Sequence, residues 1–333
     1  MHKSKTIIIS LVIAFMVIMA TFYYFAKPKA MDHQTESLST EIGAPPAPDI
    51  DRSQDRVEPQ SSLHQNNQNN QPEQEIAIPT EGFAPHKALY DIKITRIKSG
   101  SPVTGVSGDM FYKWSDECSG YATDHRFNIR YDYAEQPAVR ISSRYIAFEY
   151  KNGSEMSYVS IHDENGKRSD EISGIAKRKD DKSGEAINTK PEGLRFTLPQ
   201  DFVFPTQHTK EVLARAMRGD KFYSAIMYDG SDAEGPIEIN AVIGKETKTA
   251  DISTKAGVDE RLLSNRAWPV RLAFFKYLEN NQMSDEDIKP LYEMDILLHE
   301  NGVVSEINVD YDSFSVRQDL TALTPLPLKL DCQ

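Results

Sequence analysis

The sequence predicts a mainly β protein in which a long antiparallel sheet curls as a spiral or open barrel around one α-helix, after an N-terminal transmembrane helix. Three observations support this prediction. Most of the chain after residue 86 alternates apolar and polar residues, as strands with one buried face do. A single stretch, at 206–218, has helical spacing instead, and residues 7–26 contain no charge.

Residues 7–26, IIISLVIAFMVIMATFYYFA, are the first predicted element. A helix of this length covers about 30 Å, the thickness of a bilayer's hydrocarbon core, so we predict a membrane anchor with residues 1–6 in the cytoplasm. A cleaved signal peptide is the alternative, although FYYF followed by KPK offers no small-residue cleavage site. Both alternatives carry the rest of the chain across the membrane.

Residues 27–85 are predicted to form a disordered tether. They include the proline-rich APPAP at 44–48 and the polar tract QNNQNNQ at 65–71, with almost no aliphatic clusters. Such a composition cannot bury enough apolar surface to offset the entropy lost on ordering the chain. We interpret the tether as a passive spacer; a binding role is the alternative.

The folded domain is predicted at 86–333, and its pattern is that of strands. In KALYDIKITRI every second residue is apolar, so one face of this strand is expected to be buried. Asn-Gly pairs at 152–153, 165–166 and 301–302 lie between apolar runs, as two-residue hairpin turns do. The predicted strands are 87–97, 106–114, 121–132, 138–150, 156–162, 221–229, 236–244, 268–277, 291–299, 303–311 and 314–323.

One segment departs from the strand pattern. In PTQHTKEVLARAMRGD, Val212, Leu213, Ala216 and Met217 lie on one face at helical spacing, with a proline before them and a glycine after them. We predict a helix at 206–218. Its apolar face would fill the concavity that a curved sheet leaves.

Cys118 and Cys332 are the two cysteines of the chain. An even count in a domain outside the cytoplasm favours an internal disulfide, while free thiols or a bond between two chains are the alternatives. The internal bond would connect a position near the start of the domain to the penultimate residue of the chain.

The sequence contains no catalytic, cofactor-binding or metal-binding motif, so no enzymatic activity is predicted. The eight histidines lack metal-ligand spacing, and His125, beside Asp124, is interpreted as a solvated strand residue rather than a base. Gly105 and Gly108 lie inside a strand pattern and indicate close backbone packing or a bulge. The net charge of −12 argues against nucleic acid as a partner.

Several aromatic residues form a candidate apolar cleft. In a sheet that curls around a helix, part of this set must fill the core, and any surplus would line a cleft for an acyl chain or an extended peptide. We favour packing in the core. The residues are Phe202, Phe204, Trp268, Phe274 and Phe275.

A series of short segments, spread in order over 86–333, is similar to a known family. The segments are HKALYDIKI, GVSGDMFY, CSGY, LPQDFVFPTQHT, AWPVRLAFF and ENGVVSEINVDYDSF. Together they resemble the EipB family of alphaproteobacterial cell-envelope proteins, which help to maintain envelope integrity. The resemblance implies a periplasmic domain whose long antiparallel sheet spirals around a helix, and a disulfide between Cys118 and Cys332. The tether and the uncleaved span depart from the family's plain signal peptide.

Three functions are compatible with these observations. The first is a non-enzymatic periplasmic protein that maintains the envelope by binding peptidoglycan, a lipid or another envelope protein, while anchored in the inner membrane through 7–26. The second is a lipid or lipoprotein carrier that uses the concave face of the sheet. The third is a cell-wall hydrolase, which would require perturbed carboxylates or histidines in one cleft. We favour the first.

Overall fold

Fourteen strands and one α-helix make up the described part of the chain. The computed structural model describes residues 82–247, 256–263, 266–278 and 289–329. The helix is α2 (Pro205–Arg218), and a short 3₁₀ helix, η2, covers Glu260–Leu262. The strands are β1 (His86–Ile97), β2 (Val103–Glu117), β3 (Gly120–Tyr133), β4 (Val139–Tyr150), β5 (Glu155–Glu164), β6 (Lys167–Arg178), β7 (Gly184–Lys190), β8 (Arg195–Leu198), β9 (Phe222–Met227), β10 (Ile237–Ile243), β11 (Ala267–Lys276), β12 (Tyr292–His299), β13 (Val304–Asp310) and β14 (Phe314–Pro325).

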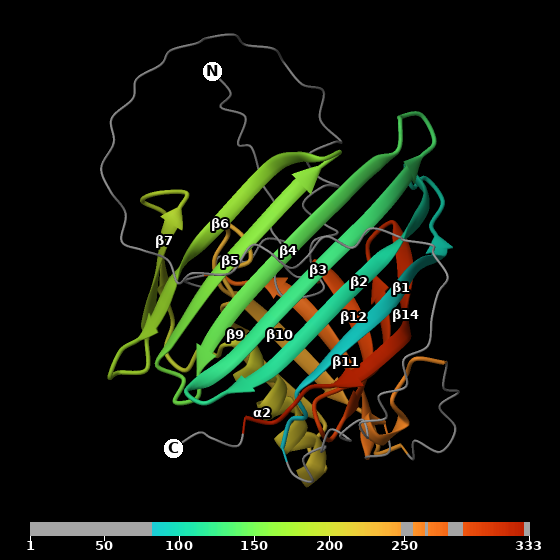
Figure 1. Cartoon of the computed structure of the whole chain (residues 1–333). Coiled ribbons are helices and arrows are strands. Elements are labelled where there is room, and N and C mark those ends of the chain that lie inside the picture. Colours follow the sequence, from blue (N-terminus) through green and yellow to red (C-terminus); the bar gives the residue numbers. More distant parts are fainter. Residues whose placement is uncertain (1–81, 248–255, 264–265, 279–288, 330–333) are drawn as a thin grey trace, which may run out of the picture. The chain divides into compact units, whose positions relative to one another are not determined.

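The chain builds one antiparallel sheet outward from its middle. β1 pairs with β2 and with β14, so β2 to β8 lead in order to one edge and β13 back to β9 lead to the other (Figure 1). Long-range register is therefore set where β1 meets β14, for example at Tyr90 opposite Leu320. Helix α2 connects β8 to β9, which are the two edge strands.

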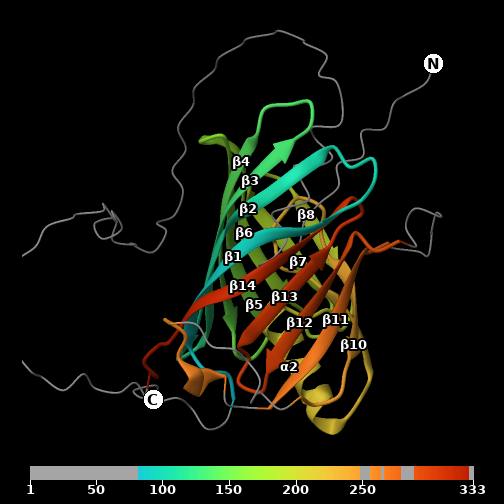
Figure 2. The same ribbon diagram turned by 90° about the vertical axis from the view of Figure 1, so that its right-hand side faces the viewer.

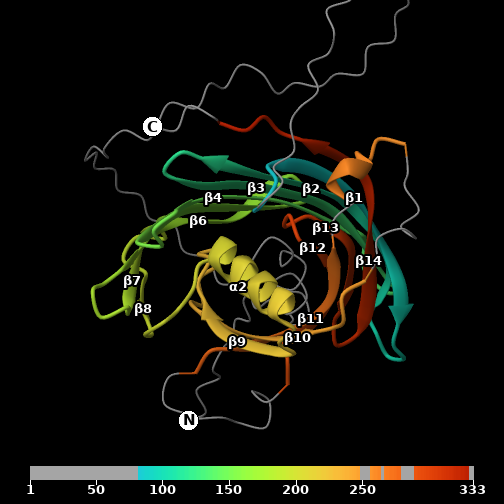
Figure 3. The ribbon, with the colours of Figure 1, turned by 90° about the horizontal axis from the view of Figure 1, so that it is seen from below.

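The sheet curls around α2, as predicted. Seen from below, β1 to β4 and β6 to β14 surround α2 (Figure 3). The view from the side shows β10 to β14 continuing into β1 and β2 (Figure 2). The two edge strands do not pair with each other, so the sheet stays open. Val203, just before α2, forms an isolated parallel bridge with Met227 at the end of β9.

Helix α2 has the predicted boundaries but buries a slightly different face. Val212, Leu213 and Ala216 are buried, whereas Met217 is 42% exposed. Gly219 ends the helix in the left-handed conformation, with φ of +84°, and its N–H donates to the carbonyl of Ala216 at 3.0 Å. Most of the apolar face of the helix therefore joins the main core, whereas Met217, near the C-terminal end of the helix, lies partly outside this core.

The strand prediction was wrong by omission for β6, β7 and β8. Several buried positions of β6 and β7 carry small side chains, among them Ala176 and Ala186, because Phe202 and Tyr158 fill the interior in front of them. At Gly184 a Cβ would lie 2.6 Å from the ring of Phe202. Alternation of small with charged residues does not resemble a half-buried strand in the sequence, which explains the omission.

The Asn-Gly prediction holds for one of three turns. Asn165 and Gly166 form a two-residue loop between β5 and β6, with φ of +50° and +78° as a type I′ turn requires. The pairs at 152–153 and 301–302 lie in four-residue loops instead.

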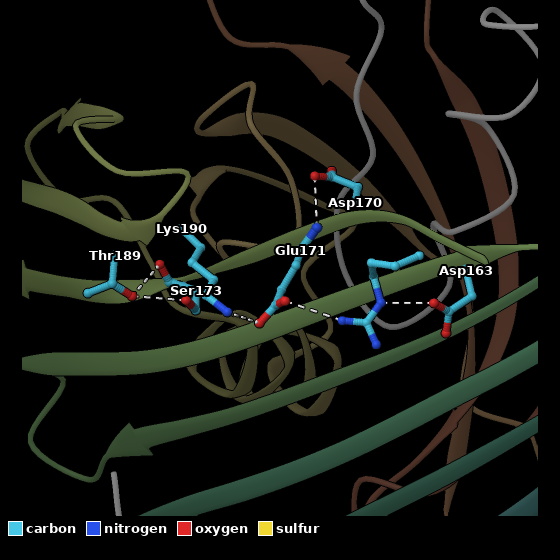
Figure 4. A network of polar contacts seen from close by, with 7 residues as sticks. Asp163, Asp170, Glu171, Ser173, Thr189 and Lys190 are labelled. Carbon is cyan, nitrogen blue, oxygen red and sulfur yellow. Dashed lines mark hydrogen bonds and ion pairs between the residues drawn. The ribbon is translucent and has the colours of Figure 1, made fainter. Parts of the chain in front are cut away.

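Polar contacts across β5, β6 and β7 organise the outer face of the sheet (Figure 4). Glu171 on β6 pairs with Arg168 at 3.2 Å and with Lys190 on β7 at 2.9 Å. Arg168 also reaches Asp163 on β5, at 2.8 Å. Because all of these side chains are partly solvated, each pair contributes little to stability and mainly specifies strand register.

The predicted anchor at 7–26 and most of the tether at 27–85 lie outside the described residues. Within the described residues, no helix is long and apolar enough to cross a membrane. Packing begins before the predicted domain boundary at 86, because Ala84 is buried and its N–H donates to the carbonyl of Asn301 at 2.9 Å.

The interpretation of Gly108 as a close-packing position gives a test. A Cβ at Gly108 would lie 2.1 Å from the carbonyl oxygen of Asn128 on β3, so Gly108→Ala must separate two paired strands. We expect a loss of about 1–3 kcal/mol in the free energy of unfolding, measured with urea. The matched control is Gly105→Ala at the bulge, where the nearest atom is the mobile carboxylate of Asp132 at 3.2 Å. Equal stability of Gly108→Ala and wild type would contradict this packing.

Candidate functional site

The N-terminus of α2 is capped by a carboxylate from the sheet. Phe204 occupies the N-cap position and has no side chain that could accept a hydrogen bond from the helix. Glu149, near the end of β4, replaces that cap: its carboxylate accepts from the N–H of Thr206 at 2.8 Å and from the Thr206 hydroxyl at 2.6 Å. A negative charge here also complements the helix dipole.

Burial makes this carboxylate unusual. Glu149 is 4% exposed, and desolvation raises its pKa from 4.5 to about 7, against the hydrogen bonds from Thr206 and Gln207, which lower it. Trp114 adds a third contact to the cap, because its indole N–H donates to the Thr206 hydroxyl at 3.4 Å. The helix is thus held inside the sheet by a buried polar network.

A partly enclosed inner cavity lies between the capped end of α2 and the sheet. Its volume is about 130 Å³, and its wall is mainly apolar, with Met110, Leu272 and Phe274 among the lining residues. Glu149 and His208 supply polar groups to the same wall. The volume is below the roughly 300–1,000 Å³ of sites that enclose drug-sized ligands.

His208 carries a buried polar atom with no hydrogen-bond partner among the described residues. The residue is 5% exposed, its Nε2 atom is unsatisfied, and its ring stacks on Tyr223 with centroids 5.6 Å apart. Desolvation lowers the pKa of His208 to about 4, so the ring is neutral at pH 7.

The interpretation of His125 as a solvated residue was wrong. His125 is 1% exposed and packs edge-on against Phe127, with centroids 4.3 Å apart, and burial lowers its pKa to about 3. Asp124 points to the opposite face of β3, where it pairs with Arg126 at 2.7 Å and with Arg144 at 3.0 Å. The sequence signal was present, since His125 alternates in phase with the buried Phe127 and Ile129.

A second hollow opens beside the outer side of α2. This groove, of about 530 Å³, is lined by Lys210, Leu213, Ala214 and Met217 of the helix, and by Phe83, Trp114 and Tyr121 opposite. The ammonium of Lys210 donates to the Tyr121 hydroxyl and lies 3.8 Å from the centroid of the Tyr121 ring. Phe83 and Trp114 also line the inner cavity, so these two side chains contact both hollows.

The five aromatic residues of the candidate cleft do not gather in one place. Phe202 and Phe204 pack edge to face at 5.2 Å in a core cluster beneath β4 to β7. Trp268 and Phe274 belong to the main core, and Phe274 alone of the five lines the inner cavity. Phe275 is partly exposed on the other face of β11.

The structure places Cys118 in the turn between β2 and β3. Cys332 lies outside the described residues, so the predicted bond stays a prediction. The C-terminal segment does approach this turn, because the ammonium of Lys329 pairs with the carboxylate of Glu117, next to Cys118 in the chain.

The described residues show no cluster of three or more histidine, cysteine, aspartate or glutamate side chains placed to hold a metal ion. Two polar groups of the inner cavity have structural partners: Glu149 caps α2, and His86 contacts the carbonyl of Ala84 at 2.8 Å through Nδ1. The Nε2 atom of His208 has no hydrogen-bond partner among the described residues. What the geometry offers is therefore a surface groove lined by Lys151, Lys210 and Lys329, and a small, mainly apolar cavity that shares two lining side chains with it.

These features define a class of protein: an open, β-barrel-like sheet that curls around a single helix, with a hollow beside that helix. The chain belongs to the EipB-like family, whose model matches residues 77–327. A curated relative, the cell envelope integrity protein EipB of Brucella abortus (strain 2308), is 31% identical over 243 residues, covering 72% of this chain and 84% of that protein. A crystal structure described as a β-barrel-like protein of a domain of unknown function, also from Brucella abortus, matches with a TM-score of 0.67 and 28% identity, over 74% of this chain and all of that one.

The raised pKa of Glu149 predicts a pH dependence that Glu149→Gln removes. A carboxyl group that titrates near pH 7 when folded and near 4.5 when unfolded destabilises the protein as the pH rises between these values. The stability of Glu149→Gln relative to wild type should therefore increase from pH 5 to pH 8, by up to about 3 kcal/mol. Urea unfolding of both proteins at several pH values from 5 to 8 measures this difference in stability. The buried histidines are common to both, so a difference that does not vary with pH would contradict the raised pKa.

Proposed function

We propose that this protein maintains the integrity of the cell envelope, without catalysis, by binding an envelope component through its β domain. The observation that carries the proposal is membership of the EipB-like family, together with the relative that is named a cell envelope integrity protein. The groove beside α2 supports a binding role, because its volume of about 530 Å³ falls within the range of ligand sites.

The proposed location is the periplasm. Residues 7–26 would anchor the chain in the inner membrane, and residues 27–85 would let the domain reach an envelope component away from the bilayer surface. If 7–26 were cleaved, the same domain would be a soluble periplasmic protein.

A disulfide between Cys118 and Cys332 is part of this proposal. Lys329 is three residues before Cys332 and pairs with Glu117, which directly precedes Cys118, so a short extended segment suffices to bring the thiols together. The bond would fasten the C-terminal segment to the β2–β3 turn, beside the groove that Lys329 also lines. A long closed loop of this kind stabilises a domain chiefly by restricting its unfolded chain.

The carrier and hydrolase alternatives receive less support. A carrier that enclosed an acyl chain within the sheet would need more space than the inner cavity of about 130 Å³ offers. A hydrolase would need a nucleophile or a pair of carboxylates facing a shared cleft, whereas Glu149 is committed to the helix cap.

Complementation tests the proposal. In a strain that lacks the chromosomal copy, the full chain should restore growth on detergents and wall-active antibiotics. Cys118→Ser and Cys332→Ser should restore it poorly, because each removes the proposed bond, whereas Ser119→Ala in the same turn should behave as wild type. Thiol blocking followed by non-reducing and reducing gels should shift the mobility of wild type alone. An unchanged phenotype on deletion would refute the envelope role, and full activity of Cys332→Ser would refute the need for the bond.

A further inference from the structure

We propose that the groove beside α2 binds a single-chain amphiphile with an anionic head group, a fatty-acid carboxylate or a lysophospholipid phosphate. The inference rests on the proposed function and names the envelope component that this groove would take. It follows from the distribution of apolar surface and charge around one face of the helix.

One wall of the groove suits an acyl chain. Lys210, Leu213, Ala214 and Met217 follow one another at helical spacing along α2, so a single cation is succeeded by two turns of apolar side chains. Met217 is 42% exposed and Ala214 is also exposed, so part of this apolar wall faces solvent. Phe83 provides apolar surface on the opposite wall.

The charges around the groove balance except at Lys210. Asp116 pairs with Lys151 at 2.6 Å, and Glu300 pairs with Arg266 at 2.7 Å. The remaining lysine of the rim, Lys329, pairs with Glu117.

Lys210 has no carboxylate within ion-pair distance in the part of the chain that the structure describes, and it donates to the Tyr121 hydroxyl instead. Glu149, whose pKa the charge of Lys210 lowers, already accepts hydrogen bonds from Thr206. A half-buried ammonium next to the apolar side chains of a groove is complementary to an anionic head group with a hydrocarbon tail.

The arrangement around Tyr121 disfavours a sugar ring as the occupant. A sugar would stack on an open aromatic face, but Trp114 stacks on Tyr121 with centroids 5.3 Å apart and Lys210 lies 3.8 Å from the same ring. The groove therefore offers a cation and aliphatic surface rather than an aromatic platform.

Photoactivatable lipids test the inference on the full chain in isolated membranes. The probes are palmitate, palmitoyl-lysophosphatidylglycerol and neutral monopalmitoylglycerol, each with a diazirine and an alkyne on the acyl chain. We expect at least one anionic probe to label the 210–217 segment about tenfold more than the neutral probe. Labelling by palmitate alone would identify the head group as a carboxylate, and labelling by the lysophospholipid alone would identify it as a phosphate.

Matched variants show whether the groove is responsible. Lys210→Ala should reduce labelling by the anionic probe about tenfold, Lys210→Arg should retain it, and Lys98→Ala, an exposed lysine at the far end of β1, should leave it unchanged. Met217→Glu places a carboxylate in the apolar wall at an exposed position and should abolish it.

Equal labelling by neutral and anionic probes, labelling outside the groove, or labelling that survives both Lys210→Ala and Met217→Glu would overturn the inference. Such a result would leave the growth phenotype of the complementation experiment intact, because that experiment does not depend on the occupant of this groove.

Discussion

The buried contact between Glu149 and the first turn of α2 is the constraint on which the rest of the structure depends. The helix connects the two edges of an open sheet, so its position decides where β8 and β9 lie. The carboxylate satisfies helix N–H groups that Phe204 leaves unpaired, and breaking a buried polar contact of this kind would expose both partners to an apolar interior. The sheet therefore holds its plug through a polar contact and not only through apolar packing.

The placement of the helix also creates both hollows. Its capped end faces the inner cavity, its Lys210–Met217 side faces the groove, and Phe83 and Trp114 line both hollows. Trp114 contacts the cap through Thr206 and stacks on Tyr121 at the groove, so the structural core and the proposed binding surface share a side chain. A ligand in the groove would thus contact the same residues that position the plug.

Much of the architecture was predictable, because alternation and helical spacing are local properties. The 206–218 helix, the antiparallel pattern of most strands and the close packing at Gly108 were predicted from single segments. β6 to β8 were not predicted, because large side chains from other segments, such as Phe202, fill the space in front of the small side chains of these strands. His125 was misjudged because its polarity was given more weight than its phase with Phe127.

The sequence by itself determined the mainly β class, the single helical plug and the resemblance to a family of envelope proteins. Only the tertiary structure decided that Glu149 caps the helix, that the five aromatic residues separate into different regions, and that Lys210 lines a groove beside the helix without a carboxylate partner among the described residues. The reason is physical. Strand and helix periodicity depend on neighbours in the chain, whereas a cap from β4, a shared aromatic wall and an unbalanced charge depend on which distant residues the closure of the sheet brings together.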